Sequence, residues 1–225
     1  MLATLFSYEI ILGTVELSIV DKSMGVVGGT LSPSDNYYAF SKIFKKRSNS
    51  ERPEIVNLNL QLQNGCFLFP SNIVVFEYES PSAVIEVSAL GIHNLIIENF
   101  FKNNDSIFLI EPWGVLSIKQ KIALENELLT EIKVNVFTRL ANWFKKKKSH
   151  PLNKFTFSAI GASGRNDEVL FEIRNKDSEY CYAVVHLTWS NKLEKSFLCA
   201  GTSYYKDFDE FKYFKMYPDR NEWES

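Results

Sequence analysis

The stretch SIKQKIALENELLTEI, residues 117–132, decides how the rest of this chain is interpreted. Ser117 and Gln120 form a capping-box pattern, in which each side chain can hydrogen-bond to the backbone N–H of the other residue. Apolar residues then recur at the helical period, on one face at Ile118, Ile122, Leu129 and Ile132 and beside it at Leu124 and Leu128. The stretch therefore predicts an amphipathic helix that begins next to Ser117.

Short runs of β-branched and aromatic residues lie on both sides of this helix and predict strands. Before it we expect a half-buried strand near 7–20 and then three strands that pair as an antiparallel meander, IVNLNLQLQ (55–63), NIVVFEYES (72–80) and AVIEVSALGI (83–92). After it come KFTFSAIGA (154–162), EVLFEIRN (168–175) and YCYAVVHLTW (180–189). Strands thus gather in groups instead of alternating with helices, which predicts an α+β fold with mainly antiparallel sheets and three to five helices.

Further helix signals precede and follow these strands. The glycine-rich stretch 25–29 predicts a turn, after which Ser32 can cap a helix over 33–46 with Pro33 at its first position. HNLIIENFF (93–101) and VFTRLANWF (136–144) add shorter helical patterns.

The last predicted helix begins at Asp207, which can cap it together with Glu210. Its core-facing residues, three positions apart, are expected to be Phe208, Phe211 and Phe214. Pro218 is expected to end this helix because proline has no N–H to donate.

Element order also suggests a division of the chain into two parts. We expect an N-terminal α+β part over 1–115 and a C-terminal part of helices and sheet over 116–225, and these two parts can share one core. The basic stretch KKKKSHP, 145–151, is another candidate boundary.

The composition is typical of a compact globular protein. Of the 225 residues, 45% are hydrophobic and 14% are aromatic, which lets a chain of this length bury roughly 70% of its unfolded surface. It therefore needs no metal or disulfide to fold. The formal net charge of -2 gives no global field strong enough to favour nucleic acid or to repel it. The one dense basic run, Lys145 through Lys148, is interpreted as the end of a helix, so we do not expect nucleic acid as the partner.

Cysteine use and the N-terminal sequence predict a cytoplasmic location. Cys66, Cys181 and Cys199 are odd in number and widely spaced, so we expect unpaired thiols. The first 21 residues lack the basic segment of a secretory signal. No uncharged apolar run reaches the ~18 residues that a membrane span requires, so we expect no membrane association.

Recognisable motifs for catalysis or metal binding are lacking in the sequence. GVVGG (25–29) has neither the lysine nor the spacing of a phosphate loop, and GASG (161–164) is one residue short of a nucleophile elbow and is interpreted as a hairpin loop. His93, His150 and His186 have no second histidine or cysteine at the spacing of a zinc site. We therefore predict no metal, no cofactor and no catalytic residue.

Two segments resemble a known family. MGVVGGTLSPSDNYYAF lies at 24–40, and NDEVLFEI followed by YAVVHLTWSNKLEK lies within 166–195. Together they resemble bacterial immunity-type proteins of polymorphic or contact-dependent toxin systems. The resemblance implies a small cytosolic protein that binds a cognate toxin domain and blocks it.

Two classes of function remain open at this stage. The first is a toxin-neutralising binding protein whose partner contacts an acidic face of the last helix, with the candidate residues Asp209, Glu210, Tyr213, Asp219, Glu222 and Glu224. Replacing Asp209, Glu210 and Glu222 with lysine is then expected to slow association and to leave folding nearly unchanged. The alternative is an enzyme, a small-ligand-binding protein or a structural or regulatory module, for which His186, Tyr182 and Asp167 are the candidate polar residues.

Overall fold

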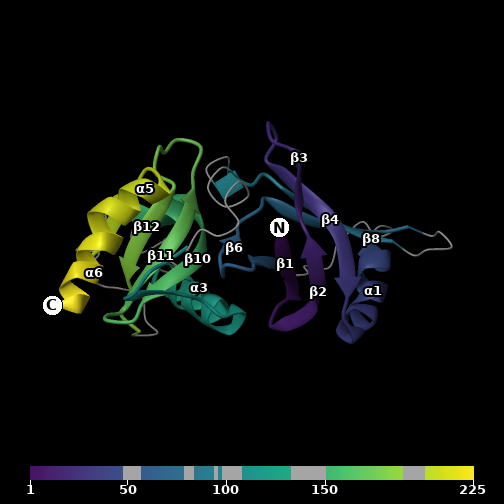
Figure 1. The fold of residues 1–225 in the computed structure, drawn as a ribbon, viewed down its shortest axis with the longest axis horizontal. Coiled ribbons are helices and arrows are strands. Elements are labelled where there is room, and N and C mark those ends of the chain that lie inside the picture. The colour runs from purple at the N-terminus through teal and green to yellow at the C-terminus, as the bar shows by residue number, and fades with distance from the viewer. Residues whose placement is uncertain (48–56, 79–83, 94–95, 98–107, 133–150, 190–200) are drawn as a thin grey trace, which may run out of the picture. The chain divides into compact units, whose positions relative to one another are not determined.

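The computed structural model describes residues 1–47, 57–78, 84–93, 96–97, 108–132, 151–189 and 201–225. The chain forms two compact units, Met1–Phe108 and Leu109–Ser225, each with its own sheet (Figure 1). All strand pairs in both sheets are antiparallel among the described residues. The predicted α+β class with mainly antiparallel sheets is therefore confirmed. The predicted helices at 93–101 and 136–144 and the basic stretch 145–151 lie largely outside the described residues.

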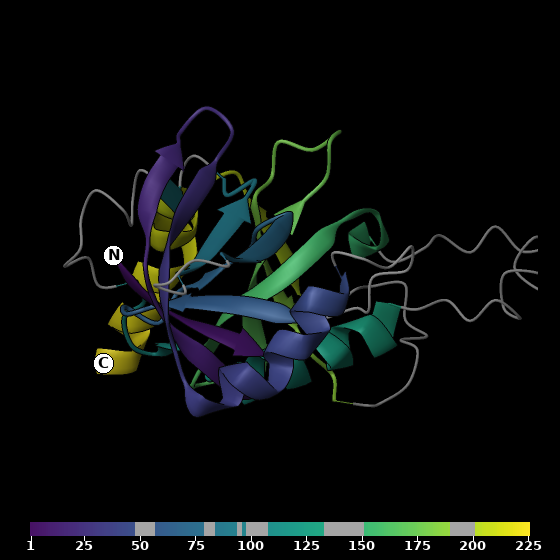
Figure 2. The same ribbon diagram turned by 90° about the vertical axis from the view of Figure 1, so that its right-hand side faces the viewer.

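Among its described residues, the first unit contains an eight-stranded sheet and the helix α1. Its strands are β1 (Leu2–Ser7), β2 (Ile10–Glu16), β3 (Ser18–Asp21), β4 (Val26–Pro33), β5 (Leu58–Leu62), β6 (Phe67–Leu68), β7 (Asn72–Glu77) and β8 (Ile85–Leu90). They follow the order β6-β5-β1-β2-β4-β8-β7, and β3 pairs with β4 beside this path. Helix α1 (Asp35–Arg47) packs against β2 and β4 (Figure 2).

Two strand predictions in this unit are wrong. The single strand expected near 7–20 is divided into β2 and β3, which are separated at Leu17. A further strand, β1, precedes it and forms a hairpin with β2, because Tyr8 turns the chain with a φ of 51° although no glycine marks the turn. The expected three-strand meander does not form either. β7 and β8 pair with each other, whereas β5 pairs with β1 and β6, which is a long-range pairing that local pattern does not encode.

The glycine-rich stretch before α1 is only partly a turn. Gly25, with a φ of 64°, turns the chain between β3 and β4, but Gly28 and Gly29 lie inside β4. A Cβ at Gly29 would come within 2.0 Å of the Glu16 carbonyl oxygen, so close strand packing explains this glycine. Because β4 continues through Pro33, α1 begins at Asp35, two residues later than predicted.

The second unit contains a five-stranded sheet and the remaining described helices. Its strands, in the order β13-β12-β11-β10-β9, are β9 (Trp113–Val115), β10 (Thr156–Ser163), β11 (Glu168–Arg174), β12 (Tyr182–His186) and β13 (Thr202–Tyr205). The helical segments are α3 (Ile118–Ile132), η2 (Pro151–Lys154), α5 (Phe208–Phe211), η3 (Lys212–Met216) and α6 (Tyr217–Glu224). The stretch 161–164, expected as a hairpin loop, mostly belongs to β10, which extends to Ser163.

Helix α3 has the start that the capping box predicted. The Ser117 N–H donates to Gln120 Oε1 at 2.9 Å, and the Gln120 N–H donates to Ser117 Oγ at 3.3 Å. Its apolar buried residues are Leu124, Leu128 and Ile132, whereas Ile118, Ile122 and Leu129 are half-buried. The buried face thus differs from the predicted one. The prediction followed apolar residues alone, whereas three charged residues, Lys121, Glu127 and Glu131, are also buried.

A buried polar cluster joins α3 to the sheet. Lys121 Nζ donates to Ser158 Oγ at 2.9 Å and also pairs with Glu125. Glu125 Oε1 in turn accepts from the Ala159 N–H of β10 at 2.9 Å. Glu172 lies opposite Ser158 in the ladder of β10 and β11 and pairs with Arg174 at 2.9 Å. Charged groups therefore bind α3 to β10 inside the unit.

The Glu172 carboxyl group gives this unit a testable pH dependence. Burial raises the pKa of Glu172 above its ordinary 4.5, although Arg174 and Lys121 act in the opposite direction. The folded protein then binds this proton more tightly than the unfolded chain. Ionisation of Glu172 therefore lowers the free energy of unfolding as the pH rises from 4.5 toward the pKa of the folded state. Glu172→Gln cannot ionise, and its unfolding free energy relative to wild type should increase between pH 4.5 and neutral pH.

Urea titrations of both proteins over this pH range measure that difference. Tryptophan fluorescence is a suitable signal because all four tryptophans lie between residues 109 and 225. A constant or decreasing difference would show that burial does not raise the pKa of Glu172.

Two of the three cysteines lie in the described part of the chain. Cys66 is buried and Cys181 is half-buried, and both carry thiols and not disulfides. Burial raises the pKa of the Cys181 thiol, and the Glu172 charge adds to this rise. Cys199 lies outside the described residues.

Candidate interaction surface

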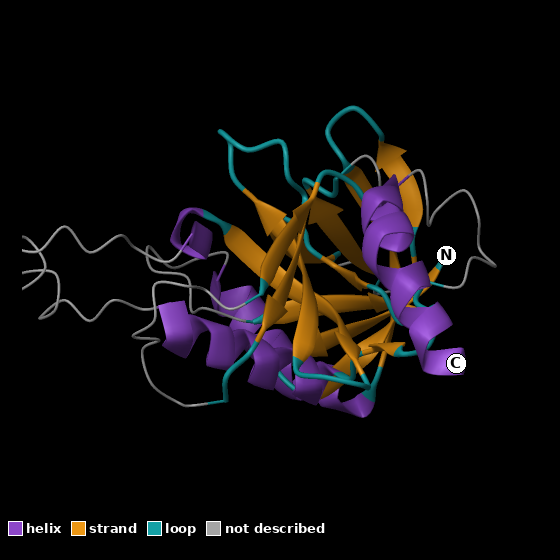
Figure 3. Cartoon of the chain, turned by 90° about the vertical axis from the view of Figure 1, so that its left-hand side faces the viewer, coloured by secondary structure: helices purple, strands orange, loops and turns teal. Residues whose placement is uncertain are grey.

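The C-terminal helical column begins as its sequence predicted. Asp207 is the N-cap residue of α5, and its Oδ1 accepts from the Glu210 N–H at 2.8 Å. The Glu210 carboxylate reaches back to accept from the Lys206 N–H. These two side chains satisfy backbone donors at the helix start, as in a capping box. Figure 3 shows the column continuing without a break to the C-terminus.

A π-turn, η3, interrupts the α-helical register in the middle of this column. The Tyr217 N–H donates to the Lys212 carbonyl, five residues back, whereas an α-helix would use the residue four back. Pro218 does not end the column as predicted. It lies in the first turn of α6, directly after the π-turn, so the helical column continues past a residue that has no N–H to donate.

The π-turn changes which residues reach the core. Phe208, Phe211 and Met216 are buried, but Phe214, expected in the core, is 73% exposed. A regular helix would next bury the residue three or four positions after Phe211, and the expectation chose three; the π-turn lengthens the interval to five, at Met216. Phe211 contacts the ring of Trp113 at 5.2 Å between centroids, so the column is anchored on β9.

Three neighbouring aromatic side chains are left in solvent by this arrangement. Tyr213 is 67% exposed, Phe214 73% and Tyr217 39%. The Tyr213 and Tyr217 rings contact each other edge to face at 5.6 Å. We call these three residues the aromatic face. Only Tyr213 was among the predicted partner-binding residues. Phe214 was expected in the core, and no signal in the sequence marked Tyr217.

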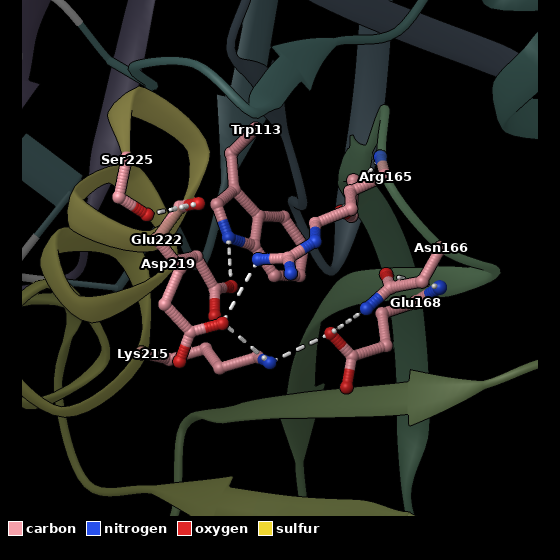
Figure 4. Close-up of polar contacts among 9 residues, drawn as sticks. Trp113, Arg165, Asn166, Glu168, Lys215, Asp219, Glu222 and Ser225 are labelled. Atoms are coloured by element: carbon pink, nitrogen blue, oxygen red, sulfur yellow. Dashed lines mark hydrogen bonds and ion pairs between the residues drawn. The ribbon is translucent and has the colours of Figure 1, made fainter.

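A polar clasp of four residues holds the column against the sheet (Figure 4). Trp113 Nε1 donates to Asp219 Oδ2 at 2.8 Å, and Lys215 Nζ lies 3.2 Å from the other Asp219 oxygen. Lys215 also pairs with Glu168 of β11 at 2.7 Å. Burial lowers the pKa of Lys215, but the hydrogen bonds and charges of Glu168 and Asp219 outweigh it and leave that pKa raised.

Asp219 is therefore turned toward the sheet and not toward a partner. The remaining predicted carboxylates lie on the outside of the column or at its start, and each has a contact within the chain. Glu210 caps the column, Asp209 pairs with Lys212 at 2.5 Å, Glu222 pairs with Arg165 at 2.9 Å, and Glu224 pairs with Arg220 at 2.8 Å. The acidic side chains of this surface are thus balanced by cations of the same chain.

The alternative polar residues have structural contacts. Tyr182 is buried, and its ring packs on Phe208 at 5.6 Å. Asp167 Oδ1 accepts from Trp189 Nε1 at 3.0 Å. His186 is half-buried at the end of β12, opposite Glu168.

The described part of the chain contains neither a membrane-spanning helix nor a cluster of metal ligands. None of its helices combines the length and apolar character needed to cross a membrane. Within the same residues, no three side chains of His, Cys, Asp or Glu gather as metal ligands would. Comparisons with protein-family models, with curated proteins and with solved structures find no match.

Proposed function

We propose that this chain is an immunity-type binding protein of the cytoplasm, which binds a cognate toxin domain through the aromatic face and neutralises it by occlusion. The observation that carries the proposal is the exposure of Tyr213, Phe214 and Tyr217 on one helical column, where the Tyr213 and Tyr217 rings contact each other. Aromatic side chains are enriched in protein interfaces and provide much of the binding energy there.

The setting of the aromatic face supports a protein partner. The polar clasp and the buried Phe208 and Phe211 fix the column to the sheet, so the backbone that carries the exposed rings is in place before a partner arrives. A preorganised surface loses less conformational entropy on binding. The resemblance of 24–40 and 166–195 to immunity-type proteins supplies the class of partner, and the second segment contains Glu168 of the clasp.

Co-expression tests this function. The candidate partner is the variable C-terminal domain of a large secreted protein encoded beside this chain. Expression of that domain alone should arrest growth, and co-expression of this chain should restore growth and yield a complex that co-purifies. Absence of such a neighbouring gene, or growth arrest that this chain does not relieve, would contradict the proposal.

A further inference from the structure

We propose that α6 is a conformational latch, which unwinds as one unit beyond Pro218 while α5 and η3 stay packed on the sheet. The hydrogen bond between Asp219 and Trp113 holds the latch closed. This inference concerns the chain by itself and does not depend on the proposed function.

Helix α6 buries no side chain. Seven of its eight residues are exposed, and Asp219 is the exception. The two segments before it differ in this respect, because α5 buries Phe208 and Phe211 and η3 buries Met216. Helices shorter than about 12–15 residues are marginal in water when nothing packs against them. α6 therefore depends on its few attachments to stay helical.

The junction between η3 and α6 is the place where unwinding can stop. The Tyr217 N–H donates to the Lys212 carbonyl across the π-turn, but Pro218 has no N–H with which to continue the backbone hydrogen bonds. Sharp bends in helices occur mostly at proline and at π-turns, and here the two adjoin each other. Loss of α6 beyond Pro218 leaves the Tyr217 hydrogen bond in place.

Among the described residues, two side chains of α6 bond to the sheet or to its loops (Figure 4). Asp219 Oδ2 accepts from Trp113 Nε1 of β9 at 2.8 Å, and Glu222 pairs with Arg165 of the loop before β11 at 2.9 Å. The side chains of Glu222 and Arg165 are 69% and 46% exposed, and exposed ion pairs contribute little to stability. The Asp219 bond joins a carboxylate to a buried indole and is the stronger attachment.

The rest of the column keeps its own attachments when α6 opens. Lys215 pairs with Glu168 of β11 at 2.7 Å, and Met216 is buried directly before the hinge. Trp113 is 1% exposed, so its indole N–H exchanges with solvent only after something uncovers it. Opening of α6 removes the acceptor of that N–H and exposes it.

Hydrogen exchange of the whole chain, followed residue by residue by NMR, tests the latch in the wild type. The Trp113 indole N–H and the backbone amides of 221–224 should have the same protection factor, because one opening event exposes them all. The Lys212 amide, which donates to the Phe208 and Asp209 carbonyls of α5, should be more strongly protected.

Asp219→Ala should speed exchange of the amides of 221–224 at least about ten-fold and leave that of Lys212 unchanged. Glu224→Ala is the matched control, since Glu224 pairs with Arg220 inside α6 and not with the sheet. Loss of such an exposed pair should change the same exchange rates less than about three-fold.

Four results would overturn the proposal. Equal acceleration of the Lys212 amide in Asp219→Ala would show that the column opens as a whole. Unaltered exchange in Asp219→Ala would show that this residue does not hold α6. Wild-type amides of 221–224 that exchange as fast as those of an unfolded peptide would mean that the latch is not closed. A Trp113 indole N–H that exchanges only as slowly as the Lys212 amide would show that α6 does not cover it. Each result concerns the chain without a partner and leaves the proposed function untouched.

Discussion

Replacing Phe211 with alanine should lower the free energy of unfolding of the second unit by about 3–5 kcal/mol, whereas the same change at Phe214 should alter it by less than about 0.5 kcal/mol. The two residues are three positions apart on one helical column, and the sequence pattern assigned both to the core. Phe211 is fully buried, and its ring contacts Trp113, Tyr205 and Phe208 at 5.2 to 5.7 Å between centroids. Phe214→Ala removes a ring that is already in water, so no cavity forms.

Urea unfolding monitored by tryptophan fluorescence measures both changes, and each variant serves as the control for the other. Equal losses of stability would mean that Phe214 is packed in the core and that the π-turn is absent. A near-neutral Phe211→Ala would show that the column is not anchored on β9.

Lys121→Ala should destabilise the second unit by about 3–5 kcal/mol, because it removes one partner of a buried ion pair and leaves the other uncompensated. Lys121 is buried beside Glu125 and Ser158, with Glu172 also near, so its loss leaves an excess of negative charge in the cluster. The Glu125 carboxylate would still accept from the Ala159 N–H, but it would have lost its cation.

Lys119→Ala is the matched control for this prediction. Lys119 lies on the same helix and is exposed, so its replacement should change stability by less than about 0.5 kcal/mol. The same urea titrations compare the two variants. A Lys121→Ala protein as stable as Lys119→Ala would show that the buried cluster does not hold α3 to β10.

Local signals explain what the sequence could predict about these elements. The capping box of Ser117 and Gln120 and the cap at Asp207 depend on residues three positions apart, so each helix start was identified correctly. The periodicity of the last helix failed at Lys212–Met216, because the π-turn lengthens the interval between buried residues to five positions.

Contacts between distant residues explain what the sequence could not predict. β5 pairs with β1, about fifty positions earlier in the chain, and not with its neighbours in the expected meander. Glu222 was expected to face a partner, yet it pairs with Arg165, and Asp219 accepts from Trp113 in the clasp. Helical periodicity predicts which face of a helix a carboxylate occupies. It does not predict which cation, distant in the sequence, the fold places beside that carboxylate.

The structure also changes the expectation for the acidic face. Glu210 caps the C-terminal column, so replacing it with lysine should destabilise the helix start by about 1 kcal/mol and not leave folding unchanged. Asp209 and Glu222 are paired with Lys212 and Arg165. Their replacement therefore alters contacts within the chain as well as the field that a partner meets. Substitutions in the aromatic face therefore distinguish an effect on binding from an effect on folding better than substitutions of these carboxylates do.

Hydrogen–deuterium exchange of this chain, with and without the neighbour-encoded toxin domain, tests the central claim most directly. The column over 207–225 is fixed by the clasp, so added protection there on complex formation reports contact with the partner. We expect protection of peptides covering Tyr213, Phe214 and Tyr217 to increase, and protection of peptides of β7, which contains the exposed Phe76, to stay unchanged. A complex that protects other segments and leaves this column unchanged would contradict it.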